Sequence, residues 1–194
     1  MPELSLEQLV HDVADALAAA DRTGASHKTF QPGIGPFGEA EAVRAVVAHL
    51  KATNPAIYGA SVIKRTPDLL VPGQWAVELK IVRPYGDNGK PAEHWSQNVL
   101  HPYEGNTSSI GDCLKLLGTQ LSERKAVLVI GYEHAPALVS VEPTLRSFEL
   151  IAREVMRIDL SPRVETLRKG LIHCVRQQLR AYGYQVNGRL VAGI

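Results

Sequence analysis

The chain opens with a helical pattern of apolar and polar positions. Apolar residues recur three and four positions apart between residues 5 and 20, which predicts an amphipathic helix there. Ser5 and Gln8 stand at its start with the spacing of a capping box. The residues of its apolar face are Leu6, Leu9, Val10, Val13 and Leu17.

A second helix is predicted over residues 37–51, after a loop over residues 22–38 in which glycine and proline are dense. On a helical wheel Glu39 falls within the apolar face, whereas Glu41 points to the opposite side. Glu39 is therefore the acidic residue that this helix is expected to turn toward the core. The apolar face consists of Val43, Val46, Val47 and Leu50.

Three short strands follow the Asn54-Pro55 breaker. They are predicted over residues 58–64, 68–71 and 75–82, the last two joined by a Pro72-Gly73 turn. Side chains alternate strictly in the last strand, so one of its faces is apolar throughout. Glu78 and Lys80 emerge together from the other face, about 7 Å apart along the strand.

The second half of the chain adds a strand and two helices with clear patterns and one ambiguous stretch. Over residues 164–182, apolar spacing favours a helix, but Gly170 and the Val164-Glu165-Thr166 segment also suit a strand. The order of elements predicts an α/β domain with one mixed sheet flanked by helices. The remaining predictions are a long polar loop over 83–108, a helix from Ser109 (its cap) to Leu121, a buried strand over 126–131 and a helix over 144–158.

Composition fits one domain over residues 1–194, because 45% of the 194 residues are hydrophobic and 21% are charged. The net charge of +1 hides an asymmetry. Residues 1–143 carry 12 Lys/Arg against 16 Asp/Glu, a balance of −4, and residues 144–194 carry 9 against 4, a balance of +5. This basic C-terminal extension fits either contact with phosphate backbones or a solvated helix face.

Nothing in the sequence points to export or to a membrane. The first residues lack the basic region and apolar stretch of a secretion signal, and no later segment has the length of a membrane span. Cys113 and Cys174 match no metal-ligand spacing and are read as free thiols in a reducing compartment. We therefore expect a cytoplasmic protein.

Two acidic residues and one lysine carry the candidate chemistry. Asp68 lies ten residues before Glu78, and the intervening turn allows the two strands to pair so that Asp68 faces Glu78. A pair of carboxylates is a hard oxygen site suited to Mg²⁺, which would hold and polarise a phosphodiester. Lys80 would orient or help deprotonate the attacking water. The structural alternative is an edge strand whose Glu78 and Lys80 are solvated and weakly paired.

The run Pro67-Asp68, nine intervening residues and Glu78-Leu79-Lys80 resembles the PD-(D/E)XK nuclease superfamily, the restriction-endonuclease-like fold. The resemblance covers about residues 37–131 and implies an αβββαβ core. It implies a DNA endonuclease that holds Mg²⁺, or Mn²⁺ in its place, through Asp68, Glu78 and the backbone carbonyl of Leu79. It further implies that Lys80 positions the water, that Glu39 is an auxiliary acid, and that the protein acts on double-stranded DNA as a homodimer.

Four residues of the long loop and the helix after it are candidate substrate contacts. Ser108, Asp112 and Lys115 fall near one side of the helix start, where Lys115 and Ser108 would meet phosphate; local capping and an Asp112-Lys115 ion pair explain the pattern equally well. Gln97 and His101 are of the residue types that contact bases in nucleic-acid-binding loops. The alternative interpretation of this segment is a packed loop anchored by Trp95 and Tyr103.

Two rival functions remain at this stage. One is a non-catalytic nucleic-acid-binding or assembly module that retains the nuclease fold, and the other is a small-molecule α/β enzyme that uses its acidic pair for different metal chemistry. A dinucleotide site is rejected, because the Gly33–Gly38 pattern follows no apolar strand and contains Pro36. No phosphate-binding P-loop sequence is present.

Overall fold

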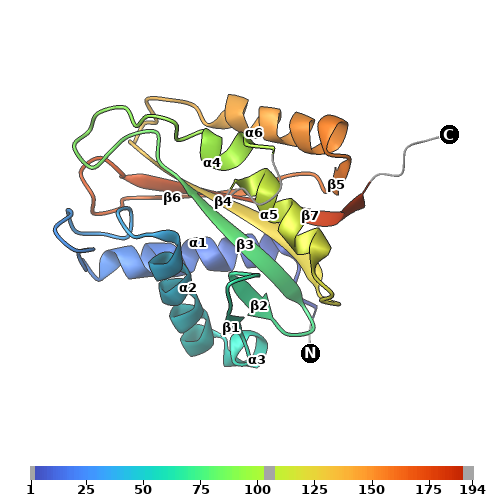
Figure 1. The fold of residues 1–194 in the computed structure, drawn as a ribbon. Coiled ribbons are helices and arrows are strands. Elements are labelled where there is room, and N and C mark those ends of the chain that lie inside the picture. The colour runs from blue at the N-terminus through green and yellow to red at the C-terminus, as the bar shows by residue number, and fades with distance from the viewer. Residues whose placement is uncertain (1–2, 103–107, 190–194) are drawn as a thin grey trace.

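A seven-stranded mixed sheet runs through the molecule, and helices cover both of its faces (Figure 1). The computed structural model describes residues 3–102 and 108–189. The strand order is β1-β2-β3-β4-β7-β5, with β6 also paired to β7. The strands are β1 (Val62–Ile63), β2 (Leu69–Val71), β3 (Trp75–Val82), β4 (Arg124–Glu133), β5 (Ile158–Leu160), β6 (Val164–Lys169) and β7 (Gln178–Arg189).

Six α-helices and one π-helical turn are found in the described residues. The predicted α/β class, with a mixed sheet between helices, is confirmed. The helices are α1 (Leu6–Arg22), α2 (Glu39–Thr53), α3 (Pro55–Tyr58), α4 (Gln97–Leu100), α5 (Ser109–Gly118) and α6 (Glu142–Leu150), which runs into the π-helical turn Ile151–Val155. None of them is long and apolar enough to span a bilayer.

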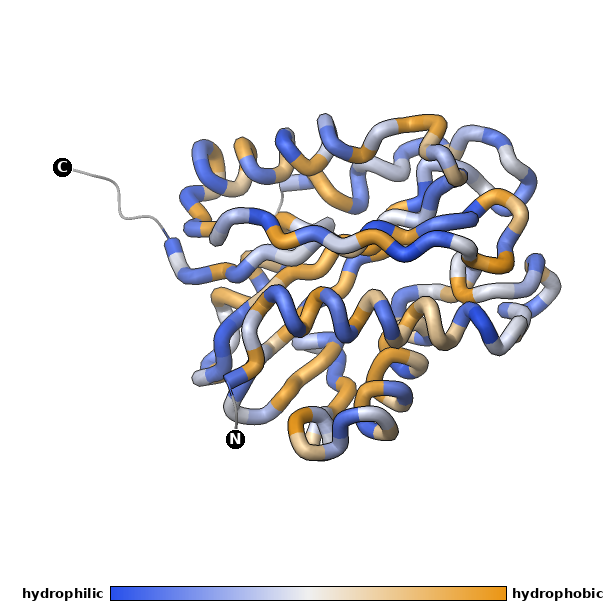
Figure 2. The backbone as a smooth tube through the Cα atoms, turned by 180° about the vertical axis from the view of Figure 1, so that it is seen from behind, coloured by the Kyte–Doolittle hydropathy of each residue, from blue (hydrophilic) through white to orange (hydrophobic). Residues whose placement is uncertain are grey.

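The strict alternation of β3 divides the core into two layers. Its odd-numbered residues pack with α1 and α2 on one face, whereas Ala76 and Val82 pack with α5 and α6 on the other. Figure 2 shows the resulting apolar strands between two layers of helices whose outer turns are polar. Helix α1 lies so close to β7 that a Cβ on Gly183 would collide with the Val10 side chain. Glu78 and Lys80 therefore emerge on the α5 side of the sheet.

The central pair of strands is parallel, and its neighbours are antiparallel. β3 pairs with β4 over its whole length, from Trp75 opposite Arg124 to Val82 opposite Gly131. The connection between them contains α5, as a parallel crossover requires. β2 pairs antiparallel with β3, and β7 pairs antiparallel with β4.

The N-terminal prediction is confirmed, whereas the first predicted strand is mostly wrong. The Ser5 hydroxyl caps α1 by accepting from the Gln8 amide at 3.1 Å, although the Gln8 side chain turns to Asp12 instead of closing the box. The segment predicted as a strand over 58–64 begins inside α3, and only two of its residues form β1. Pro55 explains the change, because proline suits the first turn of a helix.

The ambiguous stretch from 164 to 182 is not a helix. It forms β6, a loop after Gly170, whose φ is +76°, and the first part of β7. β7 pairs with β4 on one side and with both β5 and β6 on the other. The described strands of the predicted C-terminal extension, β5, β6 and β7, therefore all belong to the same sheet as β3.

Two helix boundaries also differ from prediction. Helix α5 ends at Gly118 rather than near residue 121, and Ser108, not Ser109, caps it by accepting from the Gly111 amide at 3.1 Å. The predicted helix over 144–158 starts earlier and is α-helical only to Leu150. Both segments are therefore helical as predicted, and only the positions of their ends differ from the prediction.

Candidate active site

A tight turn sets the register that brings the acidic pair together. The Gln74 amide donates to the Val71 carbonyl at 2.9 Å around Pro72 and Gly73, and Gly73 has φ +71°. Proline followed by a residue with positive φ is the pattern of a type II turn. Leu69 then pairs with Val77, so the next pair along the register is Asp68 and Glu78. Asp68 faces Glu78, as the sequence predicted.

Asp68 also completes the edge of β3. Strand β2 begins only at Leu69, which pairs with Val77, so the Leu79 amide has no strand partner on that side. The Asp68 carboxylate accepts from this amide at 2.9 Å, and Glu39 of α2 accepts from the Ile81 amide at 3.2 Å. Two carboxylates thus take the place of a missing strand and hold the edge of β3 in position.

The Lys80 ammonium lies between two carboxylates that come from different helices. Its Nζ is 3.2 Å from Glu39 Oε2 and 3.2 Å from Asp112 Oδ2. Lys115 pairs with the other oxygen of Asp112 at 2.7 Å. The side chains of Lys80 and Asp112 are 7% and 2% exposed, whereas that of Glu39 is 40% exposed. The lysine is therefore fixed from inside by Asp112 and from the solvent side by Glu39.

Burial and like charge shape the ionisation of the acidic pair. Burial, followed by the negative charges of Asp68 and Asp112, raises the pKa of Glu78 to about 8. Burial also raises the pKa of Asp68. A proton retained on Glu78 lets its carboxyl group lie next to the Asp68 carboxylate without a second full negative charge. Without a cation, the pair carries less than its full negative charge near neutral pH.

Opposing effects of burial and charge set the pKa of Lys80. Burial lowers its pKa, but the carboxylates of Asp112 and Glu39 outweigh burial, and the net pKa is raised above that of a free lysine. The ammonium therefore stays charged at neutral pH. A charged, immobilised ammonium beside two carboxyl groups suits the binding of an anion or the orientation of a water molecule.

The donor set fits a hard divalent cation. Glu78 Oε1 is buried and accepts no hydrogen bond from the residues described, so it is an acceptor without a partner. Within residues 3–102 and 108–189, no three His, Cys, Asp or Glu side chains already form a metal-binding cluster. Mg²⁺ commonly uses only one or two carboxylates and completes its shell with water and phosphate oxygens. Asp68 and Glu78 match that requirement.

The predicted substrate contacts lie at different places relative to the acidic pair. Lys115 reaches the site through Asp112, and its positive charge acts on Glu78. Ser108 is buried, caps α5 and donates from its hydroxyl to the His101 carbonyl. Gln97 is exposed on α4, and its amide nitrogen contacts the ring of His94 at 3.1 Å. Lys115 is thus linked to Lys80 through the Asp112 carboxylate.

Two further predictions concern the same region. Glu41, the weaker candidate on α2, pairs with Arg44 at 3.1 Å and leaves Glu39 as the residue at the site. Trp95 packs against the apolar core on the α5 side, which supports the packed-loop interpretation of that residue. Tyr103 lies outside the described residues.

Sequence reasoning gave Asp112 too small a role and missed Arg83. Asp112 was weighed as a cleft residue or as a local partner of Lys115, but it also pairs with Lys80. Arg83 donates to the carbonyls of Gly35 and Phe37, which ties the end of β3 to the segment just before α2. That link holds the start of α2, and with it Glu39, near Lys80. No sequence pattern signals it.

Comparisons of the chain with protein families, with curated proteins and with solved structures found no match.

The raised pKa of Glu78 predicts a pH-dependent stability. The folded protein keeps the proton up to about pH 8, whereas a free glutamate releases it near 4.5. The stability of the metal-free protein should therefore fall as pH rises between these values, because only the folded state still holds the proton. In Glu78→Gln the fall should be shallower, and its melting temperature near pH 8 should exceed that of the parent by a few degrees, on the scale of about 2–4 °C per kcal/mol.

Thermal unfolding in a chelator at about pH 5 and about pH 8 would measure this difference. Glu41→Gln, on the surface of α2, is the matched control and should follow the parent. Added Mg²⁺ should raise the melting temperature of the parent at the higher pH more than that of Glu78→Gln. Parallel pH profiles for the parent and Glu78→Gln would refute the assignment of this titration to Glu78.

Proposed function

We propose that the chain is a Mg²⁺-dependent endonuclease of the PD-(D/E)XK type that hydrolyses phosphodiester bonds in double-stranded DNA. One observation carries the proposal: Asp68 lies opposite Glu78 where β2 no longer covers the edge of β3, and the charge of the buried Lys80 ammonium acts on Asp68. Two acidic groups and a charged amine close together at one strand edge are the components that metal-assisted phosphodiester hydrolysis needs. A solvated edge strand would not explain why Glu78 and Lys80 are each only 5% exposed.

The order and pairing of the central elements support a restriction-endonuclease-like core. Helix α2 precedes an antiparallel meander of β1, β2 and β3, and α5 then leads to β4, which is parallel to β3. This is the αβββαβ order expected from the resemblance, with the short helices α3 and α4 inserted. Asp68 immediately precedes the second strand of the meander, one residue outside its predicted position, and Glu78 and Lys80 stand on the third strand.

Asp68, Glu78 and the backbone carbonyl of Leu79 are the groups that would hold Mg²⁺, with Mn²⁺ as a substitute. The bound cation would supply positive charge to a phosphate oxygen and to the attacking water. Glu78 Oε1, buried without a hydrogen-bond donor, is the ligand atom that the protein leaves available. Asp68 contributes its remaining lone pairs while it holds the Leu79 amide.

Lys80 would orient the attacking water and bind the phosphate by its charge. Because its ammonium is held by Glu39 and Asp112, its raised pKa favours the role of a hydrogen-bond donor and charged anchor over that of a free base. Glu39 acts as the auxiliary acid through Lys80 and the Ile81 amide. Lys115, 34% exposed, would contact the nucleic-acid backbone beside the site.

The remaining partner assignments rest on the resemblance and on charge. Residues 144–194 carry the excess of basic residues, which would favour a polyanion. Cleavage of both strands would be served by a homodimer. Ser108, Gln97 and His101 complete the expected substrate contacts, although Ser108 is buried at the start of α5. The alternative is a non-catalytic nucleic-acid-binding or assembly module with the same fold.

A cleavage assay on duplex DNA tests the proposal. The parent should cut in Mg²⁺ and not in a chelator, and Asp68→Asn should cut at least about 100-fold more slowly because it loses a ligand charge. Asp159→Asn is a matched control, since Asp159 lies on β5 and bonds to Asn187. It should cut like the parent.

The outcomes separate the rival functions. Equal cleavage by Asp68→Asn and the parent would remove the catalytic assignment. Duplex binding that weakens steeply with salt, without cleavage in Mg²⁺ or Mn²⁺, would favour the non-catalytic module. Neither binding nor cleavage would leave the small-molecule enzyme as the better explanation.

A further inference from the structure

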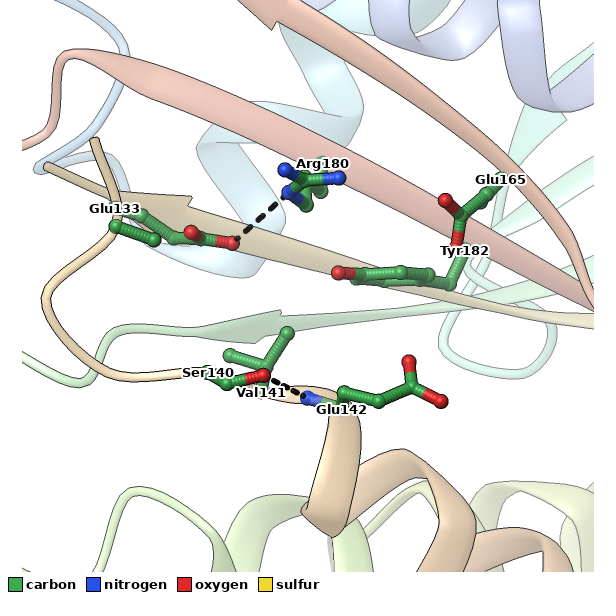
Figure 3. Close-up of a pocket in the computed structure, with 8 residues that line it drawn as sticks. Glu133, Ser140, Val141, Glu142, Glu165, Arg180 and Tyr182 are labelled. Atoms are coloured by element: carbon green, nitrogen blue, oxygen red, sulfur yellow. Dashed lines mark hydrogen bonds and ion pairs between the residues drawn. The ribbon is translucent and has the colours of Figure 1, made fainter. Parts of the chain in front are cut away.

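A cavity lies on the same face of the sheet as Glu78 and Lys80. It has a volume of about 260 Å³ and lies between the strands β4, β6 and β7 and the start of α6 (Figure 3). Drug-sized ligands occupy pockets of roughly 300–1,000 Å³, so this space suits a single flat ring system. Its lining residues are Glu133, Ala137, Ser140, Val141, Glu142, Glu165, Arg180 and Tyr182.

Glu133 brings a buried acceptor without a hydrogen-bond donor to this cavity. Its side chain is only 4% exposed, and its Oε2 accepts from Gln178 at 3.3 Å. Oε1 is buried and receives no hydrogen bond from the described part of the chain; its nearest cation is Arg180 Nε at 3.7 Å. A buried carboxylate oxygen without a donor is costly, and a ligand N–H would satisfy it.

Arg180 and Tyr182 complete the polar side of the cavity. The Arg180 side chain is 35% exposed, so its guanidinium keeps donors for a ligand next to the Glu133 carboxylate. The ring of Tyr182 is buried, and its hydroxyl end points to the side of the cavity where Glu133 lies (Figure 3). Val141 and Ala137 add apolar surface. The cavity thus offers adjoining acceptors and donors beside an aromatic ring.

The charges of the cavity argue against a phosphate ligand. Glu133, Glu142 and Glu165 all line it. Arg163 pairs with Glu142 at 2.8 Å and lies 3.9 Å from Glu165, and Arg180 is next to Glu133. Three carboxylates would repel a dianion. The ligand must instead bring N–H donors for the carboxylate and acceptors for the guanidinium.

The sheet places this cavity close to the candidate active site. Lys80 pairs with Val129, and Val129 pairs with Tyr182. All three lie in the layer on the α5 side, and two strand spacings separate Lys80 from Tyr182, about 10 Å in all. A nucleic acid whose phosphate lies at Lys80 would therefore carry a nearby base to the cavity.

We propose that the cavity binds a guanine base of the DNA substrate, an inference that rests on the proposed nuclease function. Guanine presents N1–H and N2–H₂ donors beside the O6 and N7 acceptors, which match the adjoining Glu133 carboxylate and Arg180 guanidinium. Adenine lacks the carbonyl and the N1–H, and thymine lacks the amino group. Because a base seated in this cavity cannot remain stacked in a duplex, the guanine enters it unpaired, against Tyr182.

Metal-free binding of deoxynucleoside monophosphates tests this inference without requiring catalysis. Titration calorimetry should show that dGMP binds the parent at least about tenfold more tightly than dAMP, dCMP or dTMP, whose phosphates are identical, because the base contacts are worth more than about 1.4 kcal/mol. Deoxyinosine monophosphate, which lacks only the N2 amino group, should bind more weakly than dGMP. Equal affinities, or no binding by any of the five, would overturn the inference.

Variants assign the binding to the cavity. Glu133→Gln and Arg180→Gln should each weaken dGMP binding at least about tenfold, whereas Glu154→Gln, at an exposed position of the π-helical turn, should bind dGMP like the parent. Thermal unfolding checks that each variant is folded, and only folded variants are compared. A Glu133→Gln protein that binds dGMP like the parent would refute the assignment.

The failure of this inference is distinguishable from failure of the proposed function. Cleavage of DNA by a parent protein that does not bind dGMP would refute the guanine site alone. Selective dGMP binding by a parent that never cleaves DNA would refute the nuclease proposal alone.

Discussion

Lys80→Gln is expected to reduce the single-turnover rate of DNA cleavage by at least about 100-fold, within the range of about 10²–10³ for the loss of one group that stabilises charge in the transition state. The ammonium is buried, charged and fixed between Glu39 and Asp112, so no other described cation can take its place without moving. Duplex binding in Ca²⁺ should change much less. A rate measured with saturating protein and Mg²⁺ separates the two effects.

The fold should survive this substitution, which keeps the experiment interpretable. Removing one member of a buried ion pair usually costs about 3–5 kcal/mol because the other charge is left alone. Here Asp112 retains Lys115 at 2.7 Å, and Glu39 is 40% exposed to water. Lys115→Gln is the matched comparison and should weaken DNA binding more than the rate. Cleavage by folded Lys80→Gln at the parental rate would refute the role given to Lys80.

Trp75→Ala should lower the free energy of unfolding by about 3–5 kcal/mol, as large-to-small changes of buried aromatic residues do. Trp75 begins β3, has no exposed surface, and donates from its indole nitrogen to the Leu4 carbonyl at 2.7 Å. The Arg124 guanidinium lies 4.2 Å from the ring centroid. The loss is a large part of the total of about 5–15 kcal/mol for a typical domain.

Trp95→Ala provides the control, because the chain has only two tryptophans. Trp95 is partly buried in the loop after β3 and packs at the margin of the α5-side core. Its replacement should cost clearly less than that of Trp75. Urea unfolding followed by circular dichroism measures both. Equal losses for the two variants would contradict the view that Trp75 anchors the start of β3 to the N-terminal segment.

The sequence predicted those elements whose conformation follows from a regular local repeat of apolar and polar positions. The strand over 75–82 has the predicted bounds because its alternation is strict and both layers of the core depend on it. The stretch from Leu167 to Leu179 repeats apolar residues four apart, like a helix, yet it spans two strands and a loop. β7 owes its conformation to β4, about fifty residues earlier, and a local pattern carries no information on that pairing.

The candidate site divides in the same way. Asp68, Glu78 and Lys80 follow from a motif and a turn, and Glu39 from a helical wheel, because each needs only local geometry. The ion pair between Lys80 and Asp112 depends on where α5 packs after a long connection. The approach of Glu133 to Arg180 depends on the pairing of β4 with β7. Neither contact corresponds to a recognisable spacing of residues in the sequence.

The pairing of β7 with strands on both of its sides limits how far the chain can be shortened. β7 covers eight consecutive positions of β4, from Ala126 to Glu133. A fragment that stops at residue 143 would leave this row of amides and carbonyls unsatisfied, in the middle of what was an interior strand, and such an edge recruits other chains. The smallest autonomous version of the fold thus includes β7, well past the segment that bears the nuclease-like motif.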